Sequence, residues 1–163
     1  MTYAISGLPR DRFARFFAMS NDELAAVNAR SVVADADRGF PCRITLDDVP
    51  AGERLILLNY VSHDAASPYR MAYAIYVSES GTEPAPFVDS LPPYLANRAL
   101  SLRAFGADDY VTSARLVPEG EADAAIRSLF ADPKVAYIMA HFAAYGCFAA
   151  RIERCGQNAG ESA

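Results

Sequence analysis

Hydrophobic and polar residues alternate in short runs along much of the chain, and the clearest runs lie between residues 39 and 78. Three of them have strand character: Cys42–Leu46, Arg54–Val61 and Met71–Ser78. In the middle run, residues 55–58 are apolar at odd and even positions alike, which is typical of a strand covered on both faces. Strands this close in sequence usually pair antiparallel. We therefore expect all three in one sheet, with Arg54–Val61 in its interior and residues 55–58 buried.

Apolar residues at helical spacing predict three helices. Three phenylalanines follow Pro9, at positions 13, 16 and 17, and indicate a first short helix. Ser20 and Glu23 form a capping box that begins a second short helix. A third lies between residues 118 and 132. The remaining strand-like runs are Arg30–Ala34, Leu100–Phe105, Tyr110–Val117, Val135–Phe142 and Cys147–Arg154, and the last two predict a hairpin.

This order of elements predicts an α+β fold. We expect a single domain with a largely antiparallel sheet, two short N-terminal helices and one helix before the C-terminal hairpin, because strands and helices alternate too rarely for a doubly wound parallel sheet. The length of 163 residues suits one domain. We place that domain at residues 1–156 and expect 157–163, which are small and polar, to form a frayed tail.

Composition and charge narrow the class of protein. The net charge of −5 argues against nucleic-acid and membrane partners. No apolar run is long enough to cross a bilayer and the N-terminus has no signal-peptide pattern, so we expect a cytoplasmic protein. The three cysteines and two histidines include no CxxC or zinc-type spacing, which predicts reduced thiols and neither metal nor cofactor. Oligomeric state does not follow from the sequence.

Several segments together resemble a bacterial family catalogued as a domain of unknown function, number twelve hundred and three. The segments that carry the likeness are GFPCRITL, AGERLILLNY, SPYR followed by AIYV, LSLRAF, LFADPKVAYI and GCFAARIER. Their order matches the family over roughly residues 3–154. The resemblance implies one small domain and no established activity. The family often reads His-x-His-Asn near the end of the penultimate strand, whereas this chain has Met139 and keeps only His141. Tyr73 also stands where the family has His or Gly.

Three arginines suggest a binding site for an anion. In the predicted strands, Arg43, Arg103 and Arg151 each lie on the less apolar side. If these sides coincide, the sheet presents a guanidinium cluster suited to a carboxylate or phosphate. Local ion pairs or a solvated sheet face explain the same pattern. The expected partner under the first interpretation is a small anionic ligand, and anionic-metabolite binding is our leading hypothesis for function.

Polar and aromatic residues also surround the connection between the second and third strands of the core. They are Asn59, Tyr60, His63, Tyr69 and Arg70. Side chains of these kinds at strand ends often line pockets, so we add them to the candidate ligand-binding residues. A loop held by a Ser-Pro turn and packed tyrosines accounts for them equally well.

Two alternative functions belong to other classes. A small enzyme could use His141 and Cys147, which flank the last turn and would touch if the hairpin register placed them opposite each other. One position out of register, they would point to opposite faces and form no pair. A protein-interaction domain could instead use the proline-rich segment 79–93, with Phe87 and Tyr94 as exposed aromatics.

Overall fold

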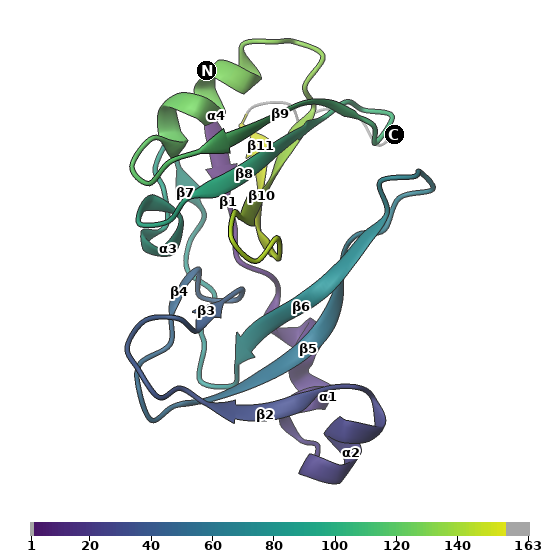
Figure 1. Ribbon diagram of the computed structural model, residues 1–163, viewed down its shortest axis with the longest axis vertical. Coiled ribbons are helices and arrows are strands. Elements are labelled where there is room, and N and C mark those ends of the chain that lie inside the picture. Colours follow the sequence, from purple (N-terminus) through teal and green to yellow (C-terminus); the bar gives the residue numbers. More distant parts are fainter. Residues whose placement is uncertain (1, 156–163) are drawn as a thin grey trace.

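The computed structural model describes residues 2–155 and arranges them around two β-sheets (Figure 1). Sheet A, in the upper half of Figure 1, has six strands, and every neighbouring pair in it is antiparallel. Their spatial order is β7 (Phe87–Val88), β1 (Tyr3–Ile5), β11 (Phe148–Arg154), β10 (Tyr137–Phe142), β8 (Leu100–Phe105) and β9 (Val111–Val117).

Sheet B lies below sheet A in the same view and has five strands. Their order is β2 (Arg30–Val33), β5 (Arg54–His63), β6 (Met71–Ser78), β3 (Pro41–Cys42) and β4 (Asp47–Asp48). The pairing is antiparallel except between β3 and β6, which run parallel. The predicted α+β class with largely antiparallel pairing is thus confirmed, and β5 is an interior strand as expected. The strands nevertheless divide into two sheets rather than one.

Short helices cover the outer sides of both sheets. A 3-10 helix, η1 (Arg10–Phe13), leads into α1 (Ala14–Phe17), and α2 (Asn21–Ala26) follows. Their apolar side chains join those of β5 and β6 in one core cluster. Sheet A packs instead against α3 (Pro93–Ala96) and α4 (Ala122–Phe130). The predicted capping box is present, since Glu23 N donates to Ser20 Oγ at 3.3 Å and Ser20 N donates to Glu23 Oε2 at 2.7 Å.

A third, smaller cluster joins the two sheets. Sheet A contributes Phe105, Tyr137, Met139 and Phe148, and sheet B contributes the half-buried Tyr60 and Met71. Of these, Tyr137 and Met139 lie on β10, whose alternate residues Ile138, Ala140 and Phe142 pack with α4 in the core of sheet A. This cluster holds the two sheets against each other, so a pocket between them is lined by residues of both.

Two details of the predicted central core are wrong. Residues 43–46 form a turn after the two-residue strand β3, because Leu8 N donates to the Arg43 carbonyl at 2.7 Å and Leu46 N donates to Cys42 O at 3.0 Å. The expected alternation of faces over Cys42–Leu46 is therefore absent, and Arg43 is buried together with Ile44. Leu57 is only half-buried, whereas Leu55, Ile56 and Leu58 are buried as predicted.

Candidate functional site

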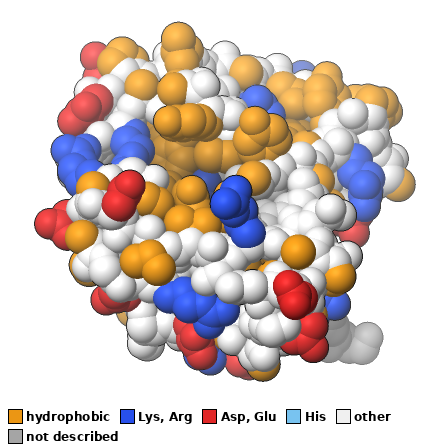
Figure 2. All heavy atoms as spheres, turned by 60° about the horizontal axis from the view of Figure 1, so that its bottom comes forward, with side chains coloured by type: hydrophobic (Ala, Val, Ile, Leu, Met, Phe, Trp, Pro, Cys, Tyr) orange, Lys and Arg blue, Asp and Glu red, His pale blue; other side chains and the backbone are white. Residues whose placement is uncertain are grey.

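A pocket of about 580 Å³ opens between the two sheets. Sheet B contributes Leu57 from β5 and the β6 segment that holds Tyr73, Ala74 and Tyr76. The opposite wall is the connection between β10 and β11, from Phe142 to Cys147, and residues 97–99 after α3 close one end. A volume of this size suits a small molecule. Figure 2 shows a hollowed face on which hydrophobic side chains gather, with blue Lys/Arg side chains beside them.

Arg43 lines the pocket as a buried cation. The residue is only 1% exposed, and its guanidinium donates from Nε to Phe148 O at 2.8 Å, from Nη1 to Pro41 O, and from Nη2 to Cys147 Sγ at 3.2 Å. Two backbone carbonyls and a thiol satisfy three of its five N–H groups. No described carboxylate forms an ion pair with it. The pocket therefore has a positive charge in its wall that the described residues leave unneutralised.

A second arginine approaches the same aromatic ring. The guanidinium carbons of Arg43 and Arg98 lie 5.1 Å and 5.4 Å from the centroid of Phe142, both within cation–π range. Arg98 differs from Arg43 because its charge has a partner: its Nη2 donates to both carboxylate oxygens of Asp48, at 2.6 and 2.7 Å. The unneutralised charge at this ring thus belongs to Arg43.

Tyr94 supports this part of the pocket from behind. Its ring meets Phe142 edge-on with centroids 5.4 Å apart, and its hydroxyl donates to Ala149 O at 2.5 Å. Complete burial raises the pKa of Tyr94, although the nearby Arg43 charge acts in the opposite direction. Tyr94 therefore stays protonated and holds the β11 backbone in place, next to the carbonyl that accepts from Arg43.

The rest of the pocket is mainly apolar and aromatic. Tyr73 and Tyr145 are 54% and 79% exposed, which is unusual for side chains of this size, and both line the pocket. The carboxylate of Glu119 is exposed and lines it as well. The arrangement can enclose an apolar body and hold one negative group beside Arg43. Among the described residues, no group of three or more His, Cys, Asp or Glu side chains is placed to hold a metal ion.

The family described as protein of unknown function (DUF1203) matches residues 39–154. The chain belongs to the DUF1203 family. The matched range includes every residue that lines the pocket, whereas β1 and the first three helical segments precede it. The comparisons gave no significant match to a curated protein or to a solved structure.

The DUF1203 protein does not bring the three predicted arginines into one contact network. Arg43 lies in the pocket wall, whereas Arg103 lies outside the pocket lining and donates from Nη1 to Met71 Sδ at 3.5 Å. Arg151 is exposed, pairs with Glu153 at 2.9 Å and lies over the Tyr137 ring. The expected arginine face rested on a strand at Cys42–Leu46, and the turn there points Arg43 elsewhere.

The predicted contact between His141 and Cys147 is also absent. A bulge at Ala140/His141 pairs His141 with Phe148, and Cys147 Sγ accepts from Arg43 instead. His141 is 1% exposed and neither ring nitrogen has a hydrogen-bond partner of ordinary geometry among the described residues. Burial and the Arg103 charge lower its pKa from 6.5 to about 4, and the nearby backbone of Met139 and Ser101 offsets part of this effect. Cys147 lines the pocket, but His141 does not.

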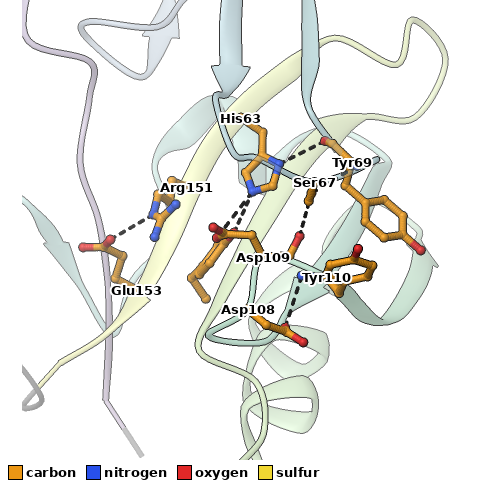
Figure 3. Close-up of polar contacts among 9 residues, drawn as sticks. His63, Ser67, Tyr69, Asp108, Asp109, Tyr110, Arg151 and Glu153 are labelled. Carbon is orange, nitrogen blue, oxygen red and sulfur yellow. Dashed lines mark hydrogen bonds and ion pairs between the residues drawn. The ribbon is translucent and has the colours of Figure 1, made fainter.

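The five predicted residues around the β5–β6 connection lie outside the pocket lining. Asn59 is exposed, Arg70 forms an exposed ion pair with Asp64, and Tyr60 is half-buried in the cluster between the sheets. Tyr69 packs edge-on against Phe105 and Tyr110. His63 is buried and belongs to a hydrogen-bond network between the sheets (Figure 3).

The two aromatics expected to be exposed in and just after segment 79–93, Phe87 and Tyr94, are not exposed. Tyr94 is 1% exposed, and Phe87 is half-buried against the core of sheet A as part of β7. The sequence predicts a loop over residues 79–93, whereas the structure has the two-residue strand β7 there and the one-turn helix α3 at its end. Both anchor aromatic side chains in the core of sheet A.

The sequence alone did not identify several of the residues that line the pocket. Leu57, Tyr73, Tyr76, Arg98, Phe142 and Tyr145 come from four separate segments. No short motif links such positions. The sequence does show that the apolar run of β5 continues through Leu57. It does not show that Leu57 pairs with Tyr76 on the neighbouring strand, which is what places both in the pocket wall.

Proposed function

We propose that this DUF1203 protein binds a small molecule that carries one carboxylate on an apolar or aromatic body, in the pocket between its sheets. The observation that supports the proposal most directly is Arg43, a 1%-exposed cation without a carboxylate partner among the described residues. A buried charge is costly unless an opposite charge or hydrogen bonds compensate it. A ligand carboxylate would supply that opposite charge.

The pocket chemistry favours a singly charged ligand over a phosphate ester. Arg98 is already neutralised by Asp48, so Arg43 supplies one net positive charge at the Phe142 ring. Glu119 adds a negative charge that would repel a second anionic group. The walls of Tyr73, Tyr76 and Leu57 would pack against the apolar part of the ligand. The expected setting is the cytoplasm, in keeping with three cysteines that are free in the structure.

The experiment is a thermal-shift screen of matched ligands. Aliphatic and aromatic monocarboxylates are compared with their primary amides and with phosphate monoesters of similar size. A ligand at about 100 times its Kd stabilises the folded protein by roughly 2.7 kcal/mol. For a chain of this length that corresponds to a rise in Tm of about 5–10 °C. We expect at least one carboxylate to raise Tm while its amide does not.

Two variants of β6 locate the site without altering the core. Ala74→Trp fills the pocket from an exposed position that lines it, and Ala72→Trp places the same side chain at an exposed position outside the lining. The thermal shift should disappear in the first variant and persist in the second. Alkylation gives an independent readout, because a bound ligand should protect Cys147 but not Cys155. Equal shifts with carboxylates and amides, or a shift that survives Ala74→Trp, would refute the proposal.

A further inference from the structure

A chain of hydrogen bonds crosses from sheet B to sheet A at the end of β5 (Figure 3). His63 is 4% exposed, and its Nδ1 lies 2.9 Å from the carbonyl oxygen of Tyr69. Its Nε2 lies 2.7 Å from the hydroxyl of Tyr137 on β10. That hydroxyl in turn donates to Asp109 Oδ1 at 2.6 Å, in the turn between β8 and β9. The chain thus ends at a carboxylate whose side chain is 45% exposed.

The protons in this chain can be assigned from its donors and acceptors. The Tyr69 carbonyl only accepts, so Nδ1 of His63 carries a proton. The Tyr137 hydroxyl has one proton but two neighbours that could accept it, His63 Nε2 and Asp109 Oδ1, and it donates to Asp109. The Arg151 side chain also hydrogen-bonds this hydroxyl, but a guanidinium can only donate. If Nε2 were unprotonated, its lone pair would face an oxygen lone pair at 2.7 Å. If the Tyr137 hydroxyl donated to Nε2 instead, its oxygen would face the Asp109 carboxylate oxygen at 2.6 Å with no proton between them. Both contacts are satisfied together when Nε2 also carries a proton.

The surrounding charges determine whether the extra proton belongs on the imidazole or on the carboxylate. Asp109 Oδ1 is 3.7 Å from Nε2, which favours an imidazolium next to a carboxylate. Solvent reaches Asp109, and water stabilises an ionised carboxylate far better than a buried site does. The other charged groups around the network are Asp108 in the same turn, Arg151 over the Tyr137 ring, Arg103 against Met71, and the exposed Asp64–Arg70 pair. Arg151 opposes a second positive charge, whereas Asp108 and Asp109 favour it.

We propose that His63 carries both imidazole protons and that His63, Tyr137 and Asp109 form a charge-assisted latch between the sheets. The latch fastens the connection between β5 and β6 to the turn between β8 and β9. Ser67 Oγ adds a bond to the Asp109 carbonyl at 3.2 Å in the same place. Without the Nε2 proton, two lone pairs would face each other at this contact, so the hold on residues 64–70 depends on that proton.

The chain offers a simple spectroscopic test because it has only two histidines. Imidazole ¹⁵N resonances of the ¹⁵N-histidine-labelled protein at pH 7 report which nitrogens carry protons. We expect both nitrogens of His63 to be protonated, whereas His141 should have one unprotonated nitrogen. Asp109→Asn should remove the Nε2 proton of His63. Asp108→Asn is the matched control, since Asp108 accepts from the Tyr110 backbone but takes no part in the hydrogen bonds among His63, Tyr137 and Asp109. This variant should leave the Nε2 proton in place.

Amide hydrogen exchange reports the latch itself. In the Asp109→Asn protein, amides in residues 64–70 should exchange about tenfold faster or more, the factor that one lost charge-assisted hydrogen bond implies. An unprotonated Nε2 at pH 7 would overturn the proposal. So would a proton found on Asp109 instead, or equal acceleration in Asp108→Asn.

Discussion

Acid should destabilise this protein through one buried side chain, His141. The perturbation is His141→Leu, in which an apolar side chain of similar volume replaces the imidazole. That imidazole is 1% exposed and makes no ordinary hydrogen bond within residues 2–155. In the native protein, burial first and the Arg103 charge second lower the pKa of His141 from 6.5 to about 4. The folded state therefore resists protonation at a pH where the unfolded chain accepts it.

The sign and magnitude of the effect follow from this difference. Above pH 6.5 the histidine is neutral in both states and contributes no pH dependence. As pH falls from 6.5 towards 4, the unfolded state binds a proton that the folded state does not, so stability is lost. One pKa unit corresponds to 1.36 kcal/mol, so the loss at pH 4 is roughly 3 kcal/mol. Below pH 4 the folded state also takes up the proton and the loss stops growing.

The assay is urea unfolding of the parent and of His141→Leu at several pH values between 7.5 and 4. Carboxylates such as Asp123, whose pKa the Arg127 hydrogen bond lowers, weaken both proteins in acid and cancel in the difference. The leucine variant should gain relative to the parent by roughly 3 kcal/mol between pH 7.5 and 4. A difference between the two proteins that stays constant over this range would refute the reasoning.

Two further predictions concern stability. Leu55→Ala and Leu57→Ala delete the same atoms two residues apart on β5, but Leu55 is fully buried and Leu57 borders the pocket. Chemical unfolding should show a loss of about 2–5 kcal/mol for Leu55→Ala and a clearly smaller loss for Leu57→Ala, and equal losses would contradict the partial exposure of Leu57. A Cβ at Gly7 would lie 1.9 Å from the carbonyl oxygen of Ile44, so Gly7→Ala must displace backbone. Gly39→Ala meets no neighbouring atom and costs only the strain of an alanine at a φ of 112°, so the Tm of Gly7→Ala should fall further.

Local patterns predicted local structure well. The apolar run at Arg54–Val61 became an interior strand, and Ser20 with Glu23 capped α2 through both expected hydrogen bonds. The alternation in Leu100–Phe105 also matched β8. These features depend on residues a few positions apart, which is the range over which side-chain periodicity and capping act.

Long-range contacts decided the features that the sequence did not predict. The run Cys42–Leu46 has strand-like alternation, yet the backbone N–H of Leu8 binds the Arg43 carbonyl and a turn forms there. That turn directs the Arg43 side chain to the β11 carbonyl of Phe148 and away from the other two arginines. A bulge of one residue likewise separated His141 from Cys147. Pairing register and the division into two sheets depend on such contacts.

The position of β1 has a consequence for synthesis of the chain. All strands of sheet B lie within residues 30–78, but β1 lies in sheet A between β7 and β11, where Tyr3 pairs with Arg154. At about 5–20 residues per second, a ribosome needs roughly 7–30 s to travel from the first of these residues to the last. Sheet B can form during that time, whereas the apolar residues Tyr3 and Ile5 have no strand partner until β7 and β11 emerge. The first strand to be made is thus among the last to take its native place.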